Sequence, residues 1–522
     1  MTCVRGGRGA LLAGLLASLA GAPPAGAIEL IEMRIPLLDT SFTVRVSELL
    51  NPTGLGNGDS DLAELDRASN GALGRQLRAL LNQPVPLSLS QIADGSVGSP
   101  LLEQAMLVLS SFGSIEGRPP DLSGESLRQA LQQASRNGQP TLLNLIQAIP
   151  GERVRVDLGR ARAVALRMAA QSRQAERLLS TMPPAPAAVA PQPAGAAPTS
   201  TAVTTTAMVP PGDGGDRSAL RSTASLAVAH RPEALQLELI EPRGAANGRL
   251  VLISHGLWDG PASFSGWGEV LAGRGFTVIL PRHPGSDSSQ QRAVLAGTAP
   301  PPDPQELALR PKDLTAVLDG VGRLGLRRPV DPGQVVVLGH SWGATTALQL
   351  AGLRPVDGDL RARCRNLDDP ERNLSWTLQC SWLRSVHQAA IQDRRVIAVG
   401  AVSPPASLLF PRGTGTDLSA RILMVSGSRD WVVPPDPEAI TPMRRGKASG
   451  NQLVLVQDGD HFNLRPGGGA DGGVLGPLLG AWTEAAFAAG EGARPRPGAA
   501  PLLNGGAWGN RQMPMVDATP AL

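Results

Sequence analysis

The pattern of apolar and polar positions divides the chain into regions of different character. Residues 28–182 begin with a short extended segment and then show leucines largely at three- and four-residue steps, which predicts helices. Ser99-Pro100 predicts a helix start before an apolar run, and Asp157 is a candidate cap for a last helix ending near Leu179. We expect a mainly helical domain here, without a catalytic constellation, that serves as a scaffold or binds an unknown protein partner.

From about residue 217 the pattern changes to short apolar runs separated by room for a helix. Leu235–Leu239 alternates like a half-buried strand, and further runs follow at 250–253, 276–280, 335–338, 396–399, 422–425 and 453–456. Strands that alternate with helices are typical of an α/β domain with a mostly parallel sheet and helices on both faces. We expect this domain over residues 217–490, with an insertion at 354–393.

Three further segments have a composition of their own. Residues 183–216 are rich in Pro, Ala and Thr, which predicts a linker, and residues 491–522 are rich in Pro, Gly and Ala, which predicts a disordered tail. At the start, two arginines precede an apolar run of about 13 residues and a small-residue cleavage pattern. This predicts a signal peptide over 1–27, cleaved near Ala27, rather than a membrane anchor, which needs roughly 20 apolar residues. We therefore expect an exported protein, periplasmic or secreted, without a transmembrane segment in its mature chain.

The composition argues against binding to nucleic acid, a metal or a cofactor, and its cysteines suggest a disulfide. The 522 residues contain 48 Lys+Arg and 45 Asp+Glu, and no basic stripe stands out, so we expect no binding to nucleic acid. Neither a metal-binding motif nor a phosphate-binding loop occurs, and we expect no metal and no cofactor. Removal of the predicted signal leaves two cysteines, Cys364 and Cys380, both in the insertion. A disulfide between them is favoured in an exported protein, and two free buried thiols are the alternative.

A candidate nucleophile follows the run at 335–338. The sequence Gly339-His340-Ser341-Trp342-Gly343 stands between a strand pattern and a helix pattern. A G-x-S-x-G turn at such a junction forces its serine into a strained, exposed conformation. Ser341 is therefore the predicted nucleophile.

A serine nucleophile needs a histidine base and a carboxylate that orients the base. Only His387 and His461 follow Ser341, and His461 comes directly after a strand pattern and a turn, which favours it as the base. Asp430 follows the run at 422–425 and is the predicted acid. The rivals are Asp436, a candidate helix cap, and Asp458 and Asp460, which are very close to His461 in sequence.

Two backbone N–H groups are predicted to form an oxyanion hole. One belongs to Trp342, directly after the nucleophile, and the other to Leu257, in the loop Ser254-His255-Gly256-Leu257-Trp258 after the run at 250–253. We expect His255 to have a structural role. The indoles of Trp258, Trp342 and Trp431 are either walls of an apolar acyl pocket or ordinary packing residues.

On these residues the C-terminal region resembles the α/β-hydrolases. The loop at 253–257, the turn at 339–343, His283-Pro284-Gly285-Ser286 and Arg310-Pro311-Lys312-Asp313 are similar to the platelet-activating-factor acetylhydrolase and dienelactone-hydrolase-like group of secreted bacterial hydrolases. Some members carry an N-terminal helical domain of unknown function, which residues 28–170 resemble. The acid at Asp430 departs from the animal acetylhydrolases, and a serine nucleophile departs from true dienelactone hydrolases.

The resemblance implies an esterase acting on small-molecule or lipid esters. An amidase or peptidase with the same triad is one alternative, and a non-catalytic partner-binding protein is another. We further expect the insertion at 354–393 to form a lid over the site, held by the disulfide.

Overall fold

The computed structural model divides into two compact units. It describes residues 28–35, 40–51, 53–83, 96–137, 141–181, 219–358, 360–414, 418–446, 449–466, 471–503, 508–510 and 512–522. The predicted signal peptide at 1–27 and the predicted linker at 183–216 lie outside these residues.

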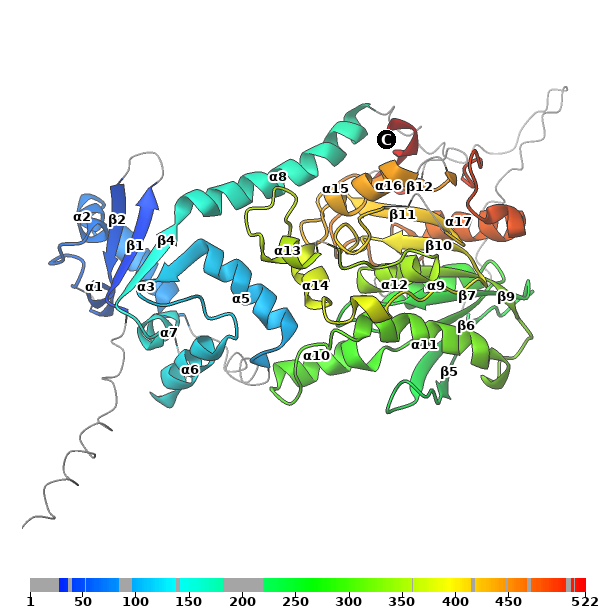
Figure 1. Cartoon of the computed structure of the whole chain (residues 1–522), viewed down its shortest axis with the longest axis horizontal. Helices are drawn as coiled ribbons and strands as arrows, with labels where there is room; N and C mark the ends of the chain where they lie inside the picture. The colour runs from blue at the N-terminus through cyan, green and yellow to red at the C-terminus, as the bar shows by residue number, and fades with distance from the viewer. Residues whose placement is uncertain are drawn as a thin grey trace, which may run out of the picture. The chain divides into compact units, whose positions relative to one another are not determined.

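The first unit combines helices with a four-stranded sheet (Figure 1). The sheet order is β2-β1-β4-β3, in which β1 runs antiparallel to β2 and parallel to β4, and β3 runs antiparallel to β4. The strands are β1 (Leu30–Ile35), β2 (Thr40–Arg45), β3 (Gly113–Ile115) and β4 (Arg153–Asp157). The prediction of a mainly helical domain included an extended start but missed this sheet, because β3 and β4 are only three and five residues long.

The predicted helices of this region are present. They are α1 (Val46–Leu50), α2 (Asp61–Ala68), α3 (Ala72–Leu81), α5 (Pro100–Phe112), α6 (Glu125–Ala134), α7 (Leu142–Ala148) and α8 (Leu158–Thr181). The Ser99 hydroxyl accepts a hydrogen bond from Leu102 N–H at 3.3 Å, and Asp157 Oδ1 accepts one from Arg160 N–H at 2.8 Å. Both side chains therefore cap the helices that follow them.

The boundary between the two units falls earlier than predicted. From Ala163 onward, α8 belongs to the second unit. There Gln171 donates hydrogen bonds to two backbone carbonyls of the insertion, and Ala175 and Leu178 pack into the core. The predicted boundary at residue 182 followed the onset of Pro-rich sequence, whereas the apolar face of α8 already packs with the α/β domain.

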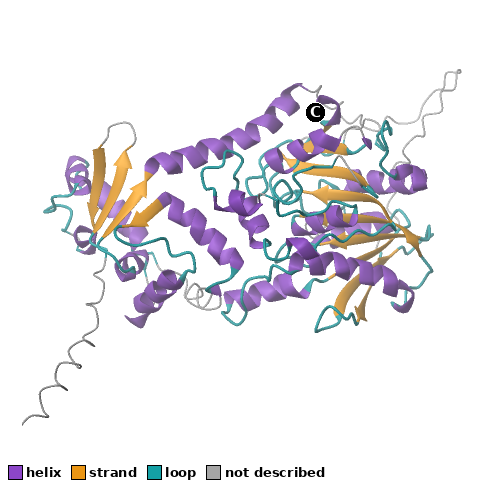
Figure 2. Ribbon diagram, in the orientation of Figure 1, coloured by secondary structure: helices purple, strands orange, loops and turns teal. Residues whose placement is uncertain are grey.

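The second unit contains a nine-stranded, mostly parallel sheet (Figure 2). Its order is β13-β12-β11-β10-β9-β7-β8-β6-β5. The strands from β12 to β8 in this order run parallel to one another, and β13 and β6 run antiparallel to the strands they join. The strands are β5 (Leu220–Leu226), β6 (Leu235–Glu241), β7 (Arg249–Ser254), β8 (Thr277–Pro281), β9 (Asp331–His340), β10 (Val396–Val402), β11 (Arg421–Gly427), β12 (Gln452–Val456) and β13 (Met515–Asp517). All seven predicted strands are confirmed, and the fold class is the one expected.

Helices cover both faces of this sheet (Figure 1). Alternate residues of each strand enter two separate cores: Leu250 and Leu252 contribute to one, and Val251 and Ile253 to the other. The helices are α9 (Ser265–Ala272), α10 (Ser288–Leu295), α11 (Glu306–Gly320), α12 (Trp342–Leu350), α13 (Leu360–Arg365), α14 (Ser375–Ser381), α15 (Pro435–Glu438), α16 (Ile440–Gly446) and α17 (Gly476–Ala489). The sheet's carboxyl edge between these layers is where ligands bind in such folds.

The prediction of a disordered tail at 491–522 is wrong for the described residues. Strand β13 adds antiparallel to β12, and Leu503, Trp508 and Met515 are buried in the core. The Gln452 side chain exchanges two hydrogen bonds of 2.9 Å with the Leu503 backbone. A few apolar residues and an open sheet edge order this segment, although its Pro/Gly/Ala-rich composition favours disorder.

Candidate active site

Ser341 stands in a strained turn between β9 and α12. Its backbone has φ 53° and ψ −121°, a region that residues other than glycine rarely adopt. A Cβ atom on Gly339 would collide with the Gly343 carbonyl, and one on Gly343 would collide with the Ser254 carbonyl. The Ser341 N–H donates to the Val402 carbonyl at 2.9 Å, which ties the turn to β10. Both flanking glycines are therefore required by close backbone packing, as the G-x-S-x-G pattern indicates.

Asp430 and His461 come together at the same edge of the sheet. Asp430 follows β11, His461 follows β12, and His461 Nδ1 lies 3.0 Å from Asp430 Oδ2. The carboxylate is fully buried, and its other oxygen accepts hydrogen bonds from the N–H groups of Val432 and Val433 at 3.1 and 2.7 Å. Since an ionised carboxylate only accepts, His461 Nδ1 carries the proton, and a neutral ring then has a free lone pair on Nε2.

The rival carboxylates are engaged elsewhere. Asp436 accepts from the Thr441 hydroxyl at 2.7 Å, and Asp458 pairs with Arg429 at 2.8 Å. Asp460 accepts from two backbone N–H groups of the turn that follows it. Of the four aspartates weighed from the sequence, Asp430 is the one that contacts the His461 ring.

The reactive atoms of Ser341 and His461 have no competing partner. Within the described part of the chain, neither the Ser341 hydroxyl nor His461 Nε2 forms a hydrogen bond. Both residues are slightly exposed, at 4% and 6%. His340, next to the serine, donates from Nε2 to the His461 carbonyl at 2.9 Å, and the two rings lie 4.7 Å apart between centroids. The turn and the histidine loop are thus directly joined.

His340 is a site residue that the sequence analysis did not identify. Burial lowers its pKa well below the ordinary value, so the ring is neutral and can donate only from Nε2, the nitrogen bonded to the His461 carbonyl. Its position next to Ser341 was the only available signal. The contact depends on a loop more than a hundred residues away, which a sequence pattern does not reveal.

The predicted oxyanion-hole residues lie beside the nucleophile. Trp342 opens α12, so its N–H is among those that a helix leaves without an intrahelical partner. In the loop after β7, a Cβ atom on Gly256 would lie 3.5 Å from Ser341 Cβ. The next N–H along, that of Leu257, is available there, whereas the Trp258 N–H is already bonded to the Ser286 carbonyl at 2.7 Å. The Trp342 N–H is thus adjacent to Ser341, and the loop of Leu257 lies against Ser341 through Gly256.

The three tryptophans of the predicted acyl pocket have different environments. The Trp342 ring is buried against Trp382 of the insertion, with ring centroids 4.4 Å apart, and is a packing residue. Trp258 is half-buried and donates to Gln290 at 2.6 Å. Trp431, next to the acid, is 52% exposed, as is Phe462, next to the histidine. The Phe462 ring lies 5.6 Å from the His461 ring between centroids, and Trp431 adjoins Asp430 in the chain.

The insertion at 354–393 is firmly attached. Cys364 and Cys380 form a disulfide with an S–S length of 2.02 Å. The buried carboxylate of Glu438 accepts hydrogen bonds from insertion side chains and from two backbone N–H groups after β10; the donors are Asn373, Ser375, Gln379, Ala406 and Ser407. The insertion also supports Trp342 through Trp382. These contacts hold the insertion against the α/β domain. Motion of the insertion as a lid over the site stays a prediction.

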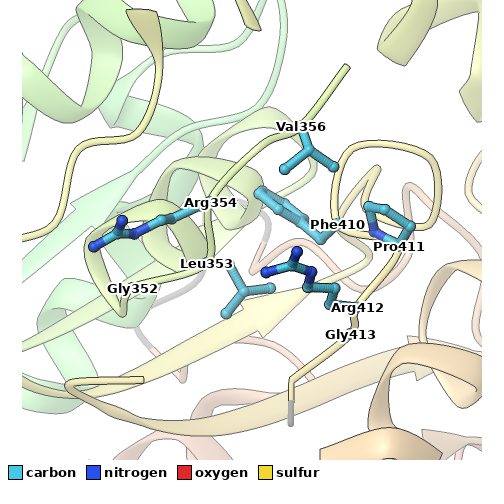
Figure 3. A pocket seen from close by; sticks show the side chains of 8 residues that line it. All are labelled: Gly352, Leu353, Arg354, Val356, Phe410, Pro411, Arg412 and Gly413. Carbon is cyan, nitrogen blue, oxygen red and sulfur yellow. The ribbon is translucent and has the colours of Figure 1, made fainter. Parts of the chain in front are cut away.

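Away from these residues, the described part of the chain contains a small hollow and no cluster of metal-binding side chains. A small hollow of about 100 Å³ lies beyond the end of α12 and contains none of the predicted site residues (Figure 3); it is lined by Gly352, Leu353, Arg354, Val356, Phe410, Pro411, Arg412 and Gly413. Among the described residues, no group of His, Cys, Asp and Glu is arranged to hold a metal ion. The helices that were described include none with the length and apolar character to cross a membrane.

Comparison with known proteins agrees with this architecture. A family model described as an alpha/beta hydrolase fold matches residues 249–367, and one described as an alpha/beta hydrolase of unknown function (DUF1400) matches residues 27–157. No curated protein matches the chain. The matches and the mostly parallel sheet show that the chain has an α/β-hydrolase fold, which suggests a hydrolase. The first match includes the Leu257 loop and the Ser341 turn but ends before Asp430 and His461.

Proposed function

We propose that this protein hydrolyses carboxylic esters with Ser341 as its nucleophile. The observation that carries the proposal is the strained Ser341, whose hydroxyl has no partner, at the same sheet edge as the His461–Asp430 pair. The strain serves to present the hydroxyl, and a pair 3.0 Å apart holds the base in one tautomer.

The proposed reaction assigns each of these residues a step of acyl transfer. Ser341 Oγ attacks the ester carbonyl carbon while His461 Nε2 takes the hydroxyl proton, and Asp430 stabilises the resulting imidazolium. The N–H groups of Leu257 and Trp342 donate to the oxyanion of the tetrahedral intermediate. Collapse breaks the bond to the alcohol, which leaves with the proton from His461. Water then attacks the acyl-enzyme by the same sequence and releases the acid.

We propose an ester with an apolar acyl or alcohol part as the substrate. The proposal rests on the exposed rings of Trp431 and Phe462, which directly follow the acid and the base in the chain and offer apolar surface to a substrate. This is compatible with the lipid esters that the resemblance to acetylhydrolase-like secreted hydrolases implies. Export after cleavage near Ala27 belongs to the same proposal, and the disulfide suits an oxidising compartment.

Hydrolysis of p-nitrophenyl butyrate by the chain from Ile28 tests the proposal, with Ser341→Ala as the matched variant. Butyryl p-nitroanilide, which has an amide in place of the ester, is assayed in parallel. Ester hydrolysis that disappears in the variant supports the proposal. Equal activity in both proteins overturns it, and hydrolysis of the anilide alone points to an amidase instead.

A further inference from the structure

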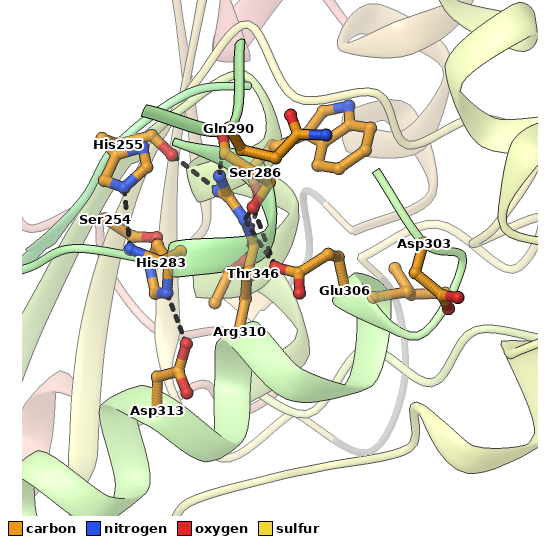
Figure 4. Close-up of polar contacts among 12 residues, drawn as sticks. Ser254, His255, His283, Ser286, Gln290, Asp303, Glu306, Arg310, Asp313 and Thr346 are labelled. Atoms are coloured by element: carbon orange, nitrogen blue, oxygen red, sulfur yellow. Dashed lines mark hydrogen bonds and ion pairs between the residues drawn. The ribbon is translucent and has the colours of Figure 1, made fainter. Parts of the chain in front are cut away.

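Arg310, on α11, is buried beside the loop that carries the Leu257 N–H (Figure 4). Its side chain is only 1% exposed. The guanidinium donates to the His255 carbonyl at 2.7 Å, to the Gly256 carbonyl at 3.1 Å and to the Ser286 hydroxyl at 2.9 Å. Its nearest carboxylate, Glu306, is 4.0 Å away. The Arg310 N–H groups therefore bond the backbone of the His255–Leu257 loop and the Ser286 hydroxyl, and not a carboxylate.

The Gly256 carbonyl oxygen accepts two hydrogen bonds. Besides Arg310, His255 Nδ1 lies 2.8 Å from it. The other ring nitrogen of His255, Nε2, accepts from the His283 N–H at 3.1 Å, so Nδ1 carries the proton and donates. Burial lowers the pKa of His255 well below its ordinary value, which keeps the ring neutral in this tautomer.

The orientation of this carbonyl determines where the Leu257 N–H points. In a trans peptide, the C=O and the following N–H point in opposite directions. Because Arg310 and His255 hold the Gly256 oxygen on one side of the loop, the Leu257 N–H is directed to the other side. Gly256 lies there against Ser341, since a Cβ atom on Gly256 would be 3.5 Å from Ser341 Cβ.

Arg310 also approaches the second oxyanion donor. Its Cζ atom lies 5.5 Å from the ring centroid of Trp342, the residue whose N–H opens α12. Burial lowers the pKa of Arg310 to about 10, so the group is still a cation at neutral pH. A single buried cation thus bonds the carbonyl of the Gly256–Leu257 peptide and lies near the ring of Trp342.

Buried charged side chains surround Arg310 and Ser286. Glu306 accepts from the Ser286 hydroxyl at 2.8 Å and pairs with Arg231, and Arg231 also pairs with Asp313 at 2.7 Å. These side chains are almost fully buried. Two guanidinium groups and two carboxylates therefore form a balanced network below the loop.

We propose that Arg310 is a positioning residue for the oxyanion hole, which fixes the Gly256–Leu257 peptide so that the Leu257 N–H faces the oxygen of the tetrahedral intermediate. This inference rests on the proposed function. It assigns His255 a share in the same role, through its bond to the Gly256 carbonyl.

Arg310→Lys is the informative variant. It keeps the buried charge, but an ammonium lacks the planar fork that reaches both carbonyls. Loss of one oxyanion donor costs about 10²–10³ in kcat, and a misdirected donor should cost on the order of 10–10². We expect this fall in kcat with KM changed by less than about threefold, because the oxyanion forms only in the transition state. The inhibition constant of a butyryl trifluoromethyl ketone, which forms a tetrahedral oxyanion on the serine, should weaken by the same factor.

Arg421→Lys is the matched control. Arg421 is also 1% exposed and donates to backbone carbonyls, but it begins β11 at the sheet edge opposite to the active site. Rates are divided by the number of sites titrated with a fluorophosphonate, which removes the contribution of unfolded protein. Both variants should lose thermal stability, and only Arg310→Lys should lose kcat and ketone affinity.

The outcomes separate the inference from the proposed function. If Arg310→Lys retains wild-type kcat per titrated site and wild-type ketone affinity, the positioning role is wrong while the esterase stands. If Arg310→Lys does not fold, His255→Gln is measured in the same way, and wild-type values there overturn the role. If the wild-type protein hydrolyses no ester, the proposed function itself fails.

Discussion

Two serine–histidine–aspartate sets lie at the carboxyl edge of the same sheet, and they differ in what surrounds them. In the first, Ser254 Oγ lies 3.0 Å from His283 Nε2, and His283 Nδ1 lies 2.7 Å from Asp313. By hydrogen bonds alone this is the more complete triad. Ser254 ends β7 and pairs in register with Gly339 of β9, so it is one strand away from Ser341.

The second set, Ser341, His461 and Asp430, has fewer hydrogen bonds among its members, but its serine and histidine are slightly exposed. Asp430 and His461 are paired, while the Ser341 hydroxyl has no partner within the described residues. Ser341 has a left-handed backbone conformation and slight exposure, and two candidate oxyanion donors flank it.

The first set is closed. Ser254, His283 and Asp313 have no exposed surface, and Asp313 is shared with His230 and Arg231. A nucleophile needs access to its substrate besides a base, and Ser254 has no exposed surface. Its set instead holds the His255 loop through the His283 N–H. The comparison indicates that serine, histidine and aspartate in one hydrogen-bonded set can have a catalytic or a structural role, and that burial distinguishes the two roles.

The largest predicted effect distinguishes the two serines. Ser341→Ala should lower kcat for p-nitrophenyl butyrate on the order of 10³–10⁶, because no other group replaces the nucleophile. Ser254→Ala should change kcat by less than about tenfold, since it removes one buried hydrogen bond away from the substrate. Steady-state kinetics of both variants checks this. A larger loss in Ser254→Ala than in Ser341→Ala would reverse the assignment.

The next effect concerns the acid. Asp430→Asn should lower kcat on the order of 10²–10⁴, because an amide no longer enforces the tautomer with the proton on His461 Nδ1. Asp458→Asn is the control and should stay within about threefold, since its carboxylate pairs with Arg429. Steady-state kinetics and thermal melts are recorded for both. Similar losses in the two variants would contradict the role of Asp430.

The disulfide of the insertion is expected to affect stability more than catalysis. It closes a loop with a sequence separation of 16 residues, for which the loss of unfolded-state entropy corresponds to about 3 kcal/mol. The double variant Cys364→Ser/Cys380→Ser should lose about this free energy of unfolding in urea. Wild-type protein in reducing buffer should lose the same amount. An unchanged urea midpoint in both would show that the insertion does not need the bond.

The last predicted effect is a dependence of stability on pH. Burial lowers the pKa of His283 to about 4 and the pKa values of His255 and His340 well below 6.5, with Arg310 further disfavouring protonation of His255 and His283 and Asp313 favouring that of His283. Below pH 6.5 the unfolded chain binds these protons and the folded chain does not. Stability should therefore fall as the pH falls from 6.5 to 5, by up to about 1.4 kcal/mol per pH unit for each ring.

Urea unfolding at several pH values measures this slope. His283→Gln should reduce it, because one buried imidazole no longer titrates in the unfolded chain alone. Substitution of His387, which is 73% exposed, should leave it unchanged. A stability that rises as the pH falls through this range would contradict the neutral state of the buried rings.

The sequence predicted the parts of the fold whose residues form continuous patterns. Seven apolar runs correspond to strands, whereas β5, with its polar Leu220–Leu226 sequence, and β13, in a Pro/Gly/Ala-rich tail, were missed. Both are antiparallel additions at the edges of the sheet, where half-exposed residues carry little pattern.

The candidate site shows the same limit. Ser341, His461 and Asp430 follow from their order after strands, which a sequence displays. The contacts of Arg310, His283 and Asp313 join residues from separate loops and helices, and a single sequence does not display such contacts. The charged residues Glu306, Arg310 and Asp313 within a buried helix were the available signal.

The most direct test of the account is the site of covalent labelling by a fluorophosphonate. Native protein from Ile28 is treated with a tagged fluorophosphonate, digested and mapped by mass spectrometry, with heat-unfolded protein as the control. The account predicts one label per chain, on Ser341, that is absent after unfolding and absent in Ser341→Ala. A label on Ser254, or a native protein that takes up none, would contradict it.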